Sequence, residues 1–145
     1  ELVRELGVRR VLLLGAYLAE VVYSRPVAVT GFSSAPDWMR ALGVEPSAYQ
    51  GPTGIVGVLA ERLAAEGARV LSLWAGLPHY IAVSPNPRGA LALVRSACQA
   101  LDLHVDDSVL VKEAAEFEER ASAFVSADPE LTEYVRQLKR REFAQ

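Results

Sequence analysis

The sequence predicts an α/β fold built on a parallel sheet and followed by C-terminal helices. Residues 11–14 and 69–75 are continuous apolar runs, which are typical of strands covered on both faces. Residues 55–63 carry apolar side chains at helical spacing between these two strands. Beyond residue 104 the apolar residues step by four and three, which indicates helices without further strands.

The other elements of the first part follow from local signals. Residues 27–30 and 80–83 are shorter strand candidates. The helix at 55–63 is expected to stop at Gly67, because glycine readily adopts the left-handed conformation that ends a helix. Strands and helices therefore alternate along this part of the chain.

A further helix is predicted after Asn86, because asparagine caps helices well and Pro87 suits a first helical turn. One face of this helix is apolar at Leu91, Val94, Cys98 and Leu101. Since Cys98 lies on that face, we interpret it as a core residue and not as a nucleophile.

The chain divides into an α/β part, residues 1–104, and a helical part, residues 105–145. The helical part breaks at Asp128-Pro129, which predicts an antiparallel helical hairpin packed on the α/β part. Its apolar stripe comprises Leu110, Ala114, Phe117, Ala121, Phe124, Leu131, Tyr134 and Leu138. Its charged outer positions are interpreted as a solvated face: Glu113, Glu116, Glu119 and Arg120.

Length and composition limit the class of protein. The 145 residues are 51% hydrophobic, enough for one buried core, and the net charge is only −3. The sequence shows no basic footprint for nucleic acid and no apolar run long enough to span a membrane. With one cysteine and no signal-peptide pattern in the first residues, we expect a soluble, cytoplasmic protein.

The segment Gly51–Gly57, with sequence GPTGIVG, is a candidate ligand site. Glycine costs about 1 kcal/mol relative to alanine inside a helix, so glycines at a helix start indicate a close approach to the backbone. The N–H groups of Thr53, Gly54 and Ile55 would then face an anion at the positive helix end. The alternative is a tight crossing of this helix with a strand, and both interpretations stay open. The spacing matches neither a Walker P-loop nor a dinucleotide fingerprint.

His79 and Tyr80 follow the strand at 69–75, and open α/β sheets bind ligands at the carboxyl ends of their strands. We therefore predict that the helix after Gly51 points its N-terminus into a concave site shared with His79. The ligand-binding candidates are Gly51, Thr53, Gly54, His79 and Tyr80.

The other reactive side chains have structural explanations. Ser33, Ser34 and Asp37 offer a catalytic triad on paper, but Ser34 and Asp37 have the spacing of a helix capping box, which we favour. A short polar run follows the helix predicted after Asn86 and comprises His104, Asp106 and Asp107. Its spacing fits no structural zinc pattern, and the two aspartates suit caps of the next helix. We expect no catalytic residue, no metal and no cofactor.

Ordered motifs along nearly the whole chain resemble the bacterial branch of the family related to proteasome assembly chaperone two. They are RVLLLG, PVAVTGFSS, YQGPTGIVG, LSLWAGLPHY and NPRGALAL, followed by an acidic helical tail. The resemblance implies a three-layer α/β/α sandwich like that of nucleoside phosphorylases, with further residues upstream. The helical phrase at residues 1–8, which has no strand before it, likewise indicates a domain that is incomplete at its N-terminus.

The resemblance also bears on partners. Characterised eukaryotic and archaeal members of this family dock on the proteasome ring with a C-terminal hydrophobic-Tyr-any tripeptide. This sequence ends Phe143-Ala144-Gln145, so the resemblance does not extend to that element and argues against proteasome docking through it. A general role in protein interaction remains.

Two functions are consistent with these observations. The first is a non-catalytic protein-interaction module resembling proteasome assembly chaperones, which forms homo-oligomers and binds a protein partner. The alternative is a small-molecule-binding protein or enzyme of nucleoside-phosphorylase-like fold with its site at Gly51–Gly57. The scarcity of acid–base partners favours the first. In that case we expect the helical hairpin to select the partner through Phe117, Phe124, Val125, Val135 and Phe143.

Overall fold

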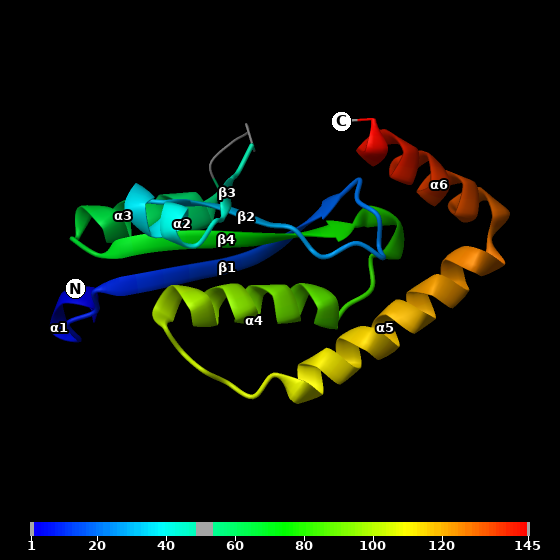
Figure 1. The fold of residues 1–145 in the computed structure, drawn as a ribbon. Coiled ribbons are helices and arrows are strands. Elements are labelled where there is room, and N and C mark those ends of the chain that lie inside the picture. Colours follow the sequence, from blue (N-terminus) through cyan, green and yellow to red (C-terminus); the bar gives the residue numbers. More distant parts are fainter. Residues whose placement is uncertain (1, 49–53, 145) are drawn as a thin grey trace.

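The computed structural model describes residues 2–48 and 54–144 of the chain. Its elements, labelled in Figure 1, are α1 (Leu2–Glu5), β1 (Arg10–Ala19), β2 (Val29–Ser33), α2 (Pro36–Ala41), β3 (Glu45–Pro46), α3 (Ile55–Ala65), β4 (Arg69–Pro78), the 3₁₀ helix η1 (His79–Ile81), α4 (Pro87–Leu101), α5 (Ser108–Ala127) and α6 (Pro129–Phe143). Among the described residues, no helix combines the length and apolar character needed to cross a membrane.

The strands form one mixed sheet in the order β1-β4-β2-β3. β1 is parallel to β4 from the pair Arg10–Arg69 to the pair Ala19–Pro78, and β3 is parallel to β2. β2, however, runs antiparallel to β4. The predicted parallel pairing is therefore confirmed for β1 with β4, but the sheet as a whole is mixed. A parallel crossover usually needs a helix, and residues 20–28 between β1 and β2 contain none.

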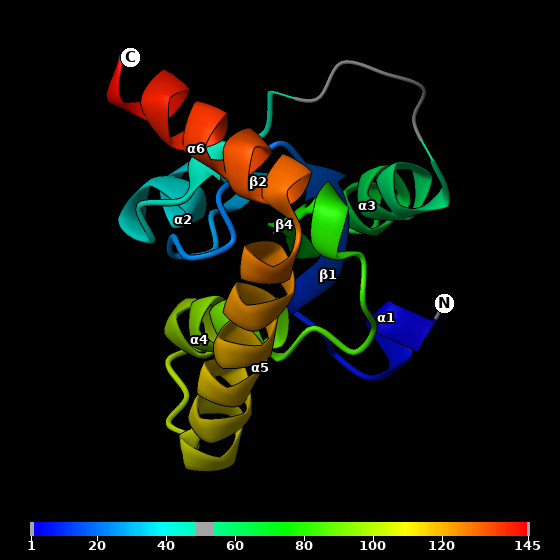
Figure 2. The same ribbon diagram turned by 90° about the vertical axis from the view of Figure 1, so that its right-hand side faces the viewer.

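β4 is a central strand whose side chains are covered on both faces. On one face Leu71 and Leu73 belong to a cluster with Ala100 of α4, and on the other face Val70 packs with Ala60 of α3. Figures 1 and 2 show α4 on one side of the sheet and α3 on the other. Helices thus cover both faces, as the apolar runs indicated.

Local signals placed several element boundaries correctly. The Asn86 side chain caps α4 by accepting a hydrogen bond from the N–H of Gly89 at 3.0 Å. Gly67, just after α3, has φ +91, which glycine alone adopts without strain. The strand predicted at 80–83 is wrong, because the chain leaves the sheet after Pro78 and turns to bury Ile81 in η1.

The two C-terminal helices do not form the antiparallel hairpin that the sequence predicted. In Figures 1 and 2, α6 turns away from α5 at the junction and does not lie along it. Asp128 accepts hydrogen bonds from the N–H groups of Glu130 and Leu131 there, at 2.8 and 3.2 Å. The buried residues of both helices pack into one cluster with Val22 and Ile81 of the α/β part, so the two helices do not need to lie along each other to bury their stripes.

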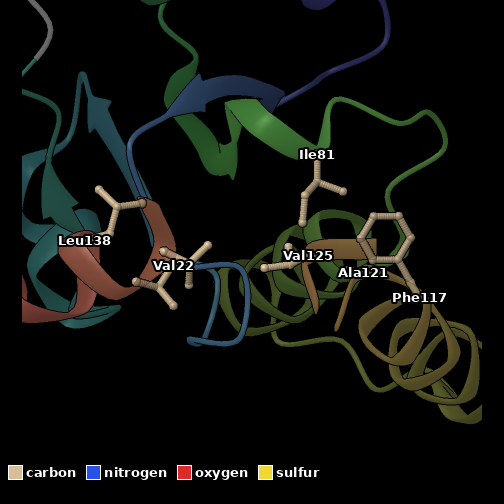
Figure 3. Close-up of a cluster of buried hydrophobic side chains, with 7 residues drawn as sticks. Val22, Ile81, Phe117, Ala121, Val125 and Leu138 are labelled. Carbon is tan, nitrogen blue, oxygen red and sulfur yellow. The ribbon is translucent and has the colours of Figure 1, made fainter. Parts of the chain in front are cut away.

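A single apolar cluster joins the helical part to the α/β part. Its buried members come from the β1–β2 connection, η1, α5 and α6: Val22, Ile81, Phe117, Ala121, Val125, Val135 and Leu138. Figure 3 shows Ile81 above Val125, Ala121 and Phe117, with Val22 and Leu138 beside them. The ends of β1 and β4 are therefore fixed to the C-terminal helices.

Candidate functional site

His79 and Tyr80 connect the ends of the two parallel strands. The Nδ1 atom of the exposed His79 ring lies 3.2 Å from the carbonyl oxygen of Ala19. The Tyr80 hydroxyl donates to the carbonyl of Val21 at 2.9 Å and accepts from the N–H of Tyr23 at 3.0 Å. Burial raises the pKa of Tyr80, and the hydrogen bond from Tyr23 opposes this rise. Both side chains therefore hold the β1–β2 connection in place.

An aromatic triangle extends this contact to α6. The rings of His79, Tyr80 and Tyr134 meet edge to face, with centroids 5.4 to 5.6 Å apart. The Tyr134 hydroxyl is buried and has no hydrogen-bond partner among the described residues. Burial raises the pKa of Tyr134, and the negative charge of Glu20 raises it further. The triangle is an aromatic junction between three segments.

The predicted ligand site at the glycine loop falls largely outside the described residues, which omit Gly51 and Thr53. Gly54 is described and precedes α3, where a Cβ would meet no atom within 4 Å. It is exposed, so no close helix crossing accounts for it. Gly54 and His79 share neither of the two cavities described below. The shared concave site stays a prediction.

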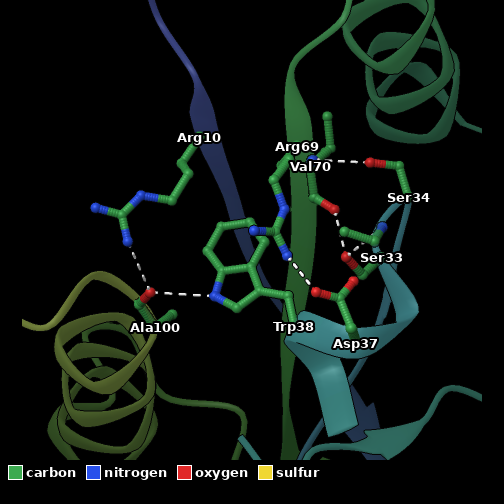
Figure 4. Close-up of polar contacts among 9 residues, drawn as sticks. Arg10, Ser33, Ser34, Asp37, Trp38, Arg69, Val70 and Ala100 are labelled. Carbon is green, nitrogen blue, oxygen red and sulfur yellow. Dashed lines mark hydrogen bonds and ion pairs between the residues drawn. The ribbon is translucent and has the colours of Figure 1, made fainter. Parts of the chain in front are cut away.

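The serine and aspartate candidates stabilise the start of β4 (Figure 4). The Ser33 hydroxyl donates to the Val70 carbonyl at 2.8 Å, and Ser34 accepts from the Val70 N–H at 2.9 Å. Asp37 pairs with Arg69 at 2.8 Å. The predicted capping box is wrong, because α2 begins after Ala35 without a side-chain cap and Ser34 is bonded to β4 instead.

These residues also lie far from His79. Val70 is near the start of β4 and His79 follows its end, so a strand of about 30 Å separates Ser33 and Ser34 from the imidazole. No serine triad forms there. Beside the same strand start, the Trp38 indole N–H donates to the Ala100 carbonyl at 3.1 Å, which fixes α2 to α4.

The polar run before α5 also has structural contacts. Asp106 accepts from the N–H of Ser108 at 3.0 Å, and hydrogen bonds from Ser108 lower the pKa of Asp106. Asp107 pairs with Arg95 of α4 at 2.7 Å. Cys98 is half-buried on α4. Across residues 2–48 and 54–144, no three His, Cys, Asp or Glu side chains gather in a way that would hold a metal ion.

A groove of about 920 Å³ lies between α5 and the segment that leads from η1 into α4. We call it the α5 groove. Its lining comprises Tyr80, Ile81, Ala82, Val83, Pro85, Asn86, Pro87, Ala90, Leu110, Glu113, Glu116, Phe117, Arg120, Ala121 and Phe124. A second cavity, of about 280 Å³, lies between α4 and the α2–β3 turn, where Ser96 and Gln99 are its polar lining. The α5 groove has the size and apolar character of a binding surface.

The two walls of the α5 groove differ in charge. Residues 80–87 carry no charged side chain. The α5 wall carries Glu113, Glu116 and Arg120, all exposed. Large apolar side chains remain in contact with solvent on both walls, since Val83 is 59% and Phe124 55% exposed. An apolar floor with a charged rim is the usual composition of a protein-binding surface.

The predicted interaction residues are divided between core and surface. Phe124 and Phe143 are exposed, whereas Phe117 is buried. Val125 and Val135 are only 4% and 5% exposed, so they are core residues in this fold and do not face a partner as expected. The α5 helix is rotated so that Val125, and not Phe124, faces the cluster around Ile81.

Comparison with known proteins settles the family. The sequence model of the PAC2 family matches residues 1–125. The chain belongs to the PAC2 family. This family includes homologues of proteasome assembly chaperones, so the resemblance seen in the sequence is confirmed. No curated protein matches the chain.

Several solved structures are similar to this fold. A PAC2 protein from Streptomyces avermitilis is 39% identical over 92% of the chain, with TM-score 0.81. The Mycobacterium tuberculosis proteasome-assembly chaperone homologue Rv2125 is 35% identical over 92%, with TM-score 0.81. Rv2714, a protein of unknown function from the same organism, is 28% identical over 99%, with TM-score 0.89. The chain spans about half the length of these relatives, namely 56%, 57% and 49%.

The sequence analysis missed the α5 groove. Its walls, residues 80–90 and 110–124, are separated in the chain, and neither has a motif that indicates binding. Val83 was assigned to a strand, and the charges of α5 were interpreted as a solvated face. The available signal was the mixture of Phe124 with Glu116 and Arg120 on one side of a helix, because a purely solvated face rarely carries an exposed aromatic ring.

Proposed function

We propose that this PAC2 chain is a non-catalytic protein-interaction module of the proteasome-assembly-chaperone type, and that it binds an apolar segment of a partner protein in the α5 groove. The observation that carries the proposal is the groove itself, an apolar floor with the exposed anchors Val83 and Phe124. The 35% identical relative Rv2125, a proteasome-assembly chaperone homologue, supports the same class.

The contacts of the catalytic candidates also favour this function over an enzyme. Ser33, Ser34 and Asp37 are bonded to β4, and His79 faces a backbone carbonyl and two tyrosine rings. The alternative, a small-molecule site at Gly51–Gly57 in a phosphorylase-like fold, stays a prediction. No contact of the described residues favours it.

The test uses purified 20S proteasome α-subunits from the organism that encodes the chain, because Rv2125 is named for proteasome assembly. We expect the chain to co-elute with unassembled α-subunits in size-exclusion chromatography. Phe124→Asp and Val83→Asp should abolish the complex, because each replaces an exposed apolar anchor of the groove by a charge.

Ile55→Asp is the matched control, since Ile55 is 80% exposed on α3 and lines neither described cavity. It should leave the complex unchanged. Absence of any complex, or a complex that survives both groove variants, would contradict the proposed function.

A further inference from the structure

One side of α5 carries an exposed stripe that borders the α5 groove. The stripe comprises Val109, Glu113, Glu116, Arg120 and Phe124. With about 100° of rotation per residue, these positions fall within an arc of about 80° on the helix. They therefore face the same way, while Phe117, Ala121 and Val125 face the core.

The chemistry of the stripe has an order along the helix: apolar, acidic, acidic, basic, apolar. Val109 is 70% and Phe124 55% exposed, so both ends of the stripe offer an apolar side chain to a partner. Among the described residues, neither Glu113 nor Arg120 has an ion-pair partner, and Glu116 has only Lys112 at 3.9 Å. Acidic and basic groups are thus present on one stripe without meeting each other.

This order is complementary to itself when the stripe is reversed. If two copies of α5 lie antiparallel about a point between Glu116 and Phe117, Val109 of each copy lies opposite Phe124 of the other. Glu113 lies opposite Arg120, and Glu116 is one turn away from the same guanidinium. A two-fold axis makes every such contact twice, which is the property of a symmetric dimer interface. A parallel arrangement would instead place like charges opposite each other.

We propose that a second copy of this chain occupies the α5 groove, with the two α5 helices antiparallel and Arg120 of each copy facing Glu113 and Glu116 of the other. The uncharged wall at residues 80–87, with Val83 exposed, lies beside the incoming helix, which brings its own exposed Phe124 to the interface. The dimer closes the groove, so a partner segment must displace the second copy. The displacement of the second copy by a partner segment rests on the proposed function, whereas the dimer itself does not.

Charge reversal tests the interface without changing its shape. In sedimentation velocity, the original chain should show a concentration-dependent monomer–dimer equilibrium. The double variant Glu113→Arg/Glu116→Arg and the single variant Arg120→Glu should each weaken dimerisation by about tenfold or more, because each places like charges opposite each other twice. Glu119→Arg, which lies off the stripe on the same helix, is the control and should dimerise normally.

Mixing the two variants gives the decisive result. In the mixed dimer both sets of contacts become attractive again, so an equimolar mixture should form a heterodimer although neither variant dimerises alone. This recovery also demonstrates that both variants are folded. A monomeric original chain, dimers that resist the reversals, or a mixture that stays monomeric would each overturn the inference.

The two proposals fail separately. If the variants exchange partners as expected but α-subunits never bind, the dimer stands and the chaperone function fails. If α-subunits bind in the groove while the original chain is monomeric, the function stands and the dimer fails. If both hold, added α-subunits should shift the original chain from dimer to a complex that contains one copy, because the partner and the second copy compete for the same groove.

Discussion

β1 and β4 are neighbouring parallel strands of the same length, 10 residues each, paired along their full extent, yet their surroundings differ sharply. In β4, Val70, Leu71 and Leu73 are fully buried. In β1, Leu14 is 52% and Leu18 58% exposed. The position in the sheet makes the difference: β4 has strands on both sides, while β1 is at the end of the strand order. Apolar composition alone therefore does not define a core strand.

The largest effect should come from truncating one leucine in each strand. Leu73→Ala should reduce the free energy of unfolding by about 3 kcal/mol, because it leaves a cavity between the sheet and α4. Leu14→Ala should cost less than about 0.5 kcal/mol, since half of this side chain already contacts water. Urea denaturation of both variants measures the contrast. Equal losses of unfolding free energy would show that Leu14 is buried by another surface in solution. If the loss for Leu14→Ala then increases with protein concentration, that surface belongs to a second copy of the chain.

The second prediction concerns rings that cross between the strands. Each strand places an aromatic side chain over a glycine of the other: Trp74 over Gly15, and Tyr17 over Gly76. A Cβ at position 15 would lie 2.5 Å from the Trp74 ring, which a 2.8 Å hydrogen bond to Ser72 holds in place. Gly15→Ala should therefore destabilise the fold by about 2 kcal/mol in thermal or urea unfolding.

Gly76→Ala provides the matched comparison. Its Cβ would lie 3.3 Å from the Tyr17 hydroxyl, and the Tyr17 side chain is 43% exposed and free to shift. We expect a loss below about 1 kcal/mol. If Gly76→Ala costs more than Gly15→Ala, the edge strand holds its ring more rigidly than the central strand does.

The strand ends give a smaller contrast between two tyrosines. Tyr80→Phe removes two hydrogen bonds that hold the β1–β2 connection, and should cost about 1 kcal/mol. Tyr134→Phe removes a buried hydroxyl without a partner among the described residues, so stability should be unchanged or slightly higher. Unfolding at neutral pH checks both variants. A larger loss for Tyr134→Phe would reveal a hydrogen bond that forms only in solution.

The smallest effect should depend on pH. Arg4 of α1 pairs with Glu66 at the end of α3 and so joins the segment before β1 to that helix. The hydrogen bond from Arg4 lowers the pKa of Glu66. A lowered folded-state pKa stabilises the fold at pH values above the ordinary carboxyl pKa of about 4.3, and this contribution is lost as the pH falls through the folded value. Glu66→Gln should therefore flatten the acid side of the stability profile slightly. Glu61→Gln, at an exposed site of α3, should leave it unchanged.

Much of the α/β part followed from local sequence signals. Asn86 and Gly67 act within a few residues, so their predictions were confirmed. The capping box at Ser34 failed because a partner distant in sequence, Val70, takes the hydroxyl. The order and direction of the strands also depend on long-range pairing. The apolar runs of β1 and β4 are similar in sequence, so the sequence does not show which of them is the central strand.

The candidate site was harder to predict for a related reason. Phe124 and Val125 are adjacent and both apolar, and one helical step of about 100° decides which of them faces the core. That rotation depends on Ile81, which reaches α5 only because the strand expected at 80–83 is a 3₁₀ turn. Because residues 80–83 were predicted as a strand, neither the buried face of α5 nor the α5 groove could be predicted.

The parallel pairing of β1 with β4 has a consequence for how fast the chain folds. Arg10 pairs with Arg69 and Ala19 with Pro78, so every contact of this ladder closes a loop of 59 residues. The entropy of such a closure must be lost before the contacts form, whereas α4, α5 and α6 assemble from neighbours in sequence. Docking of β1 should thus be a late event in folding. Until then β4, whose side chains are buried on both faces in the native fold, has a bare flank, and that interval is when aggregation competes with folding.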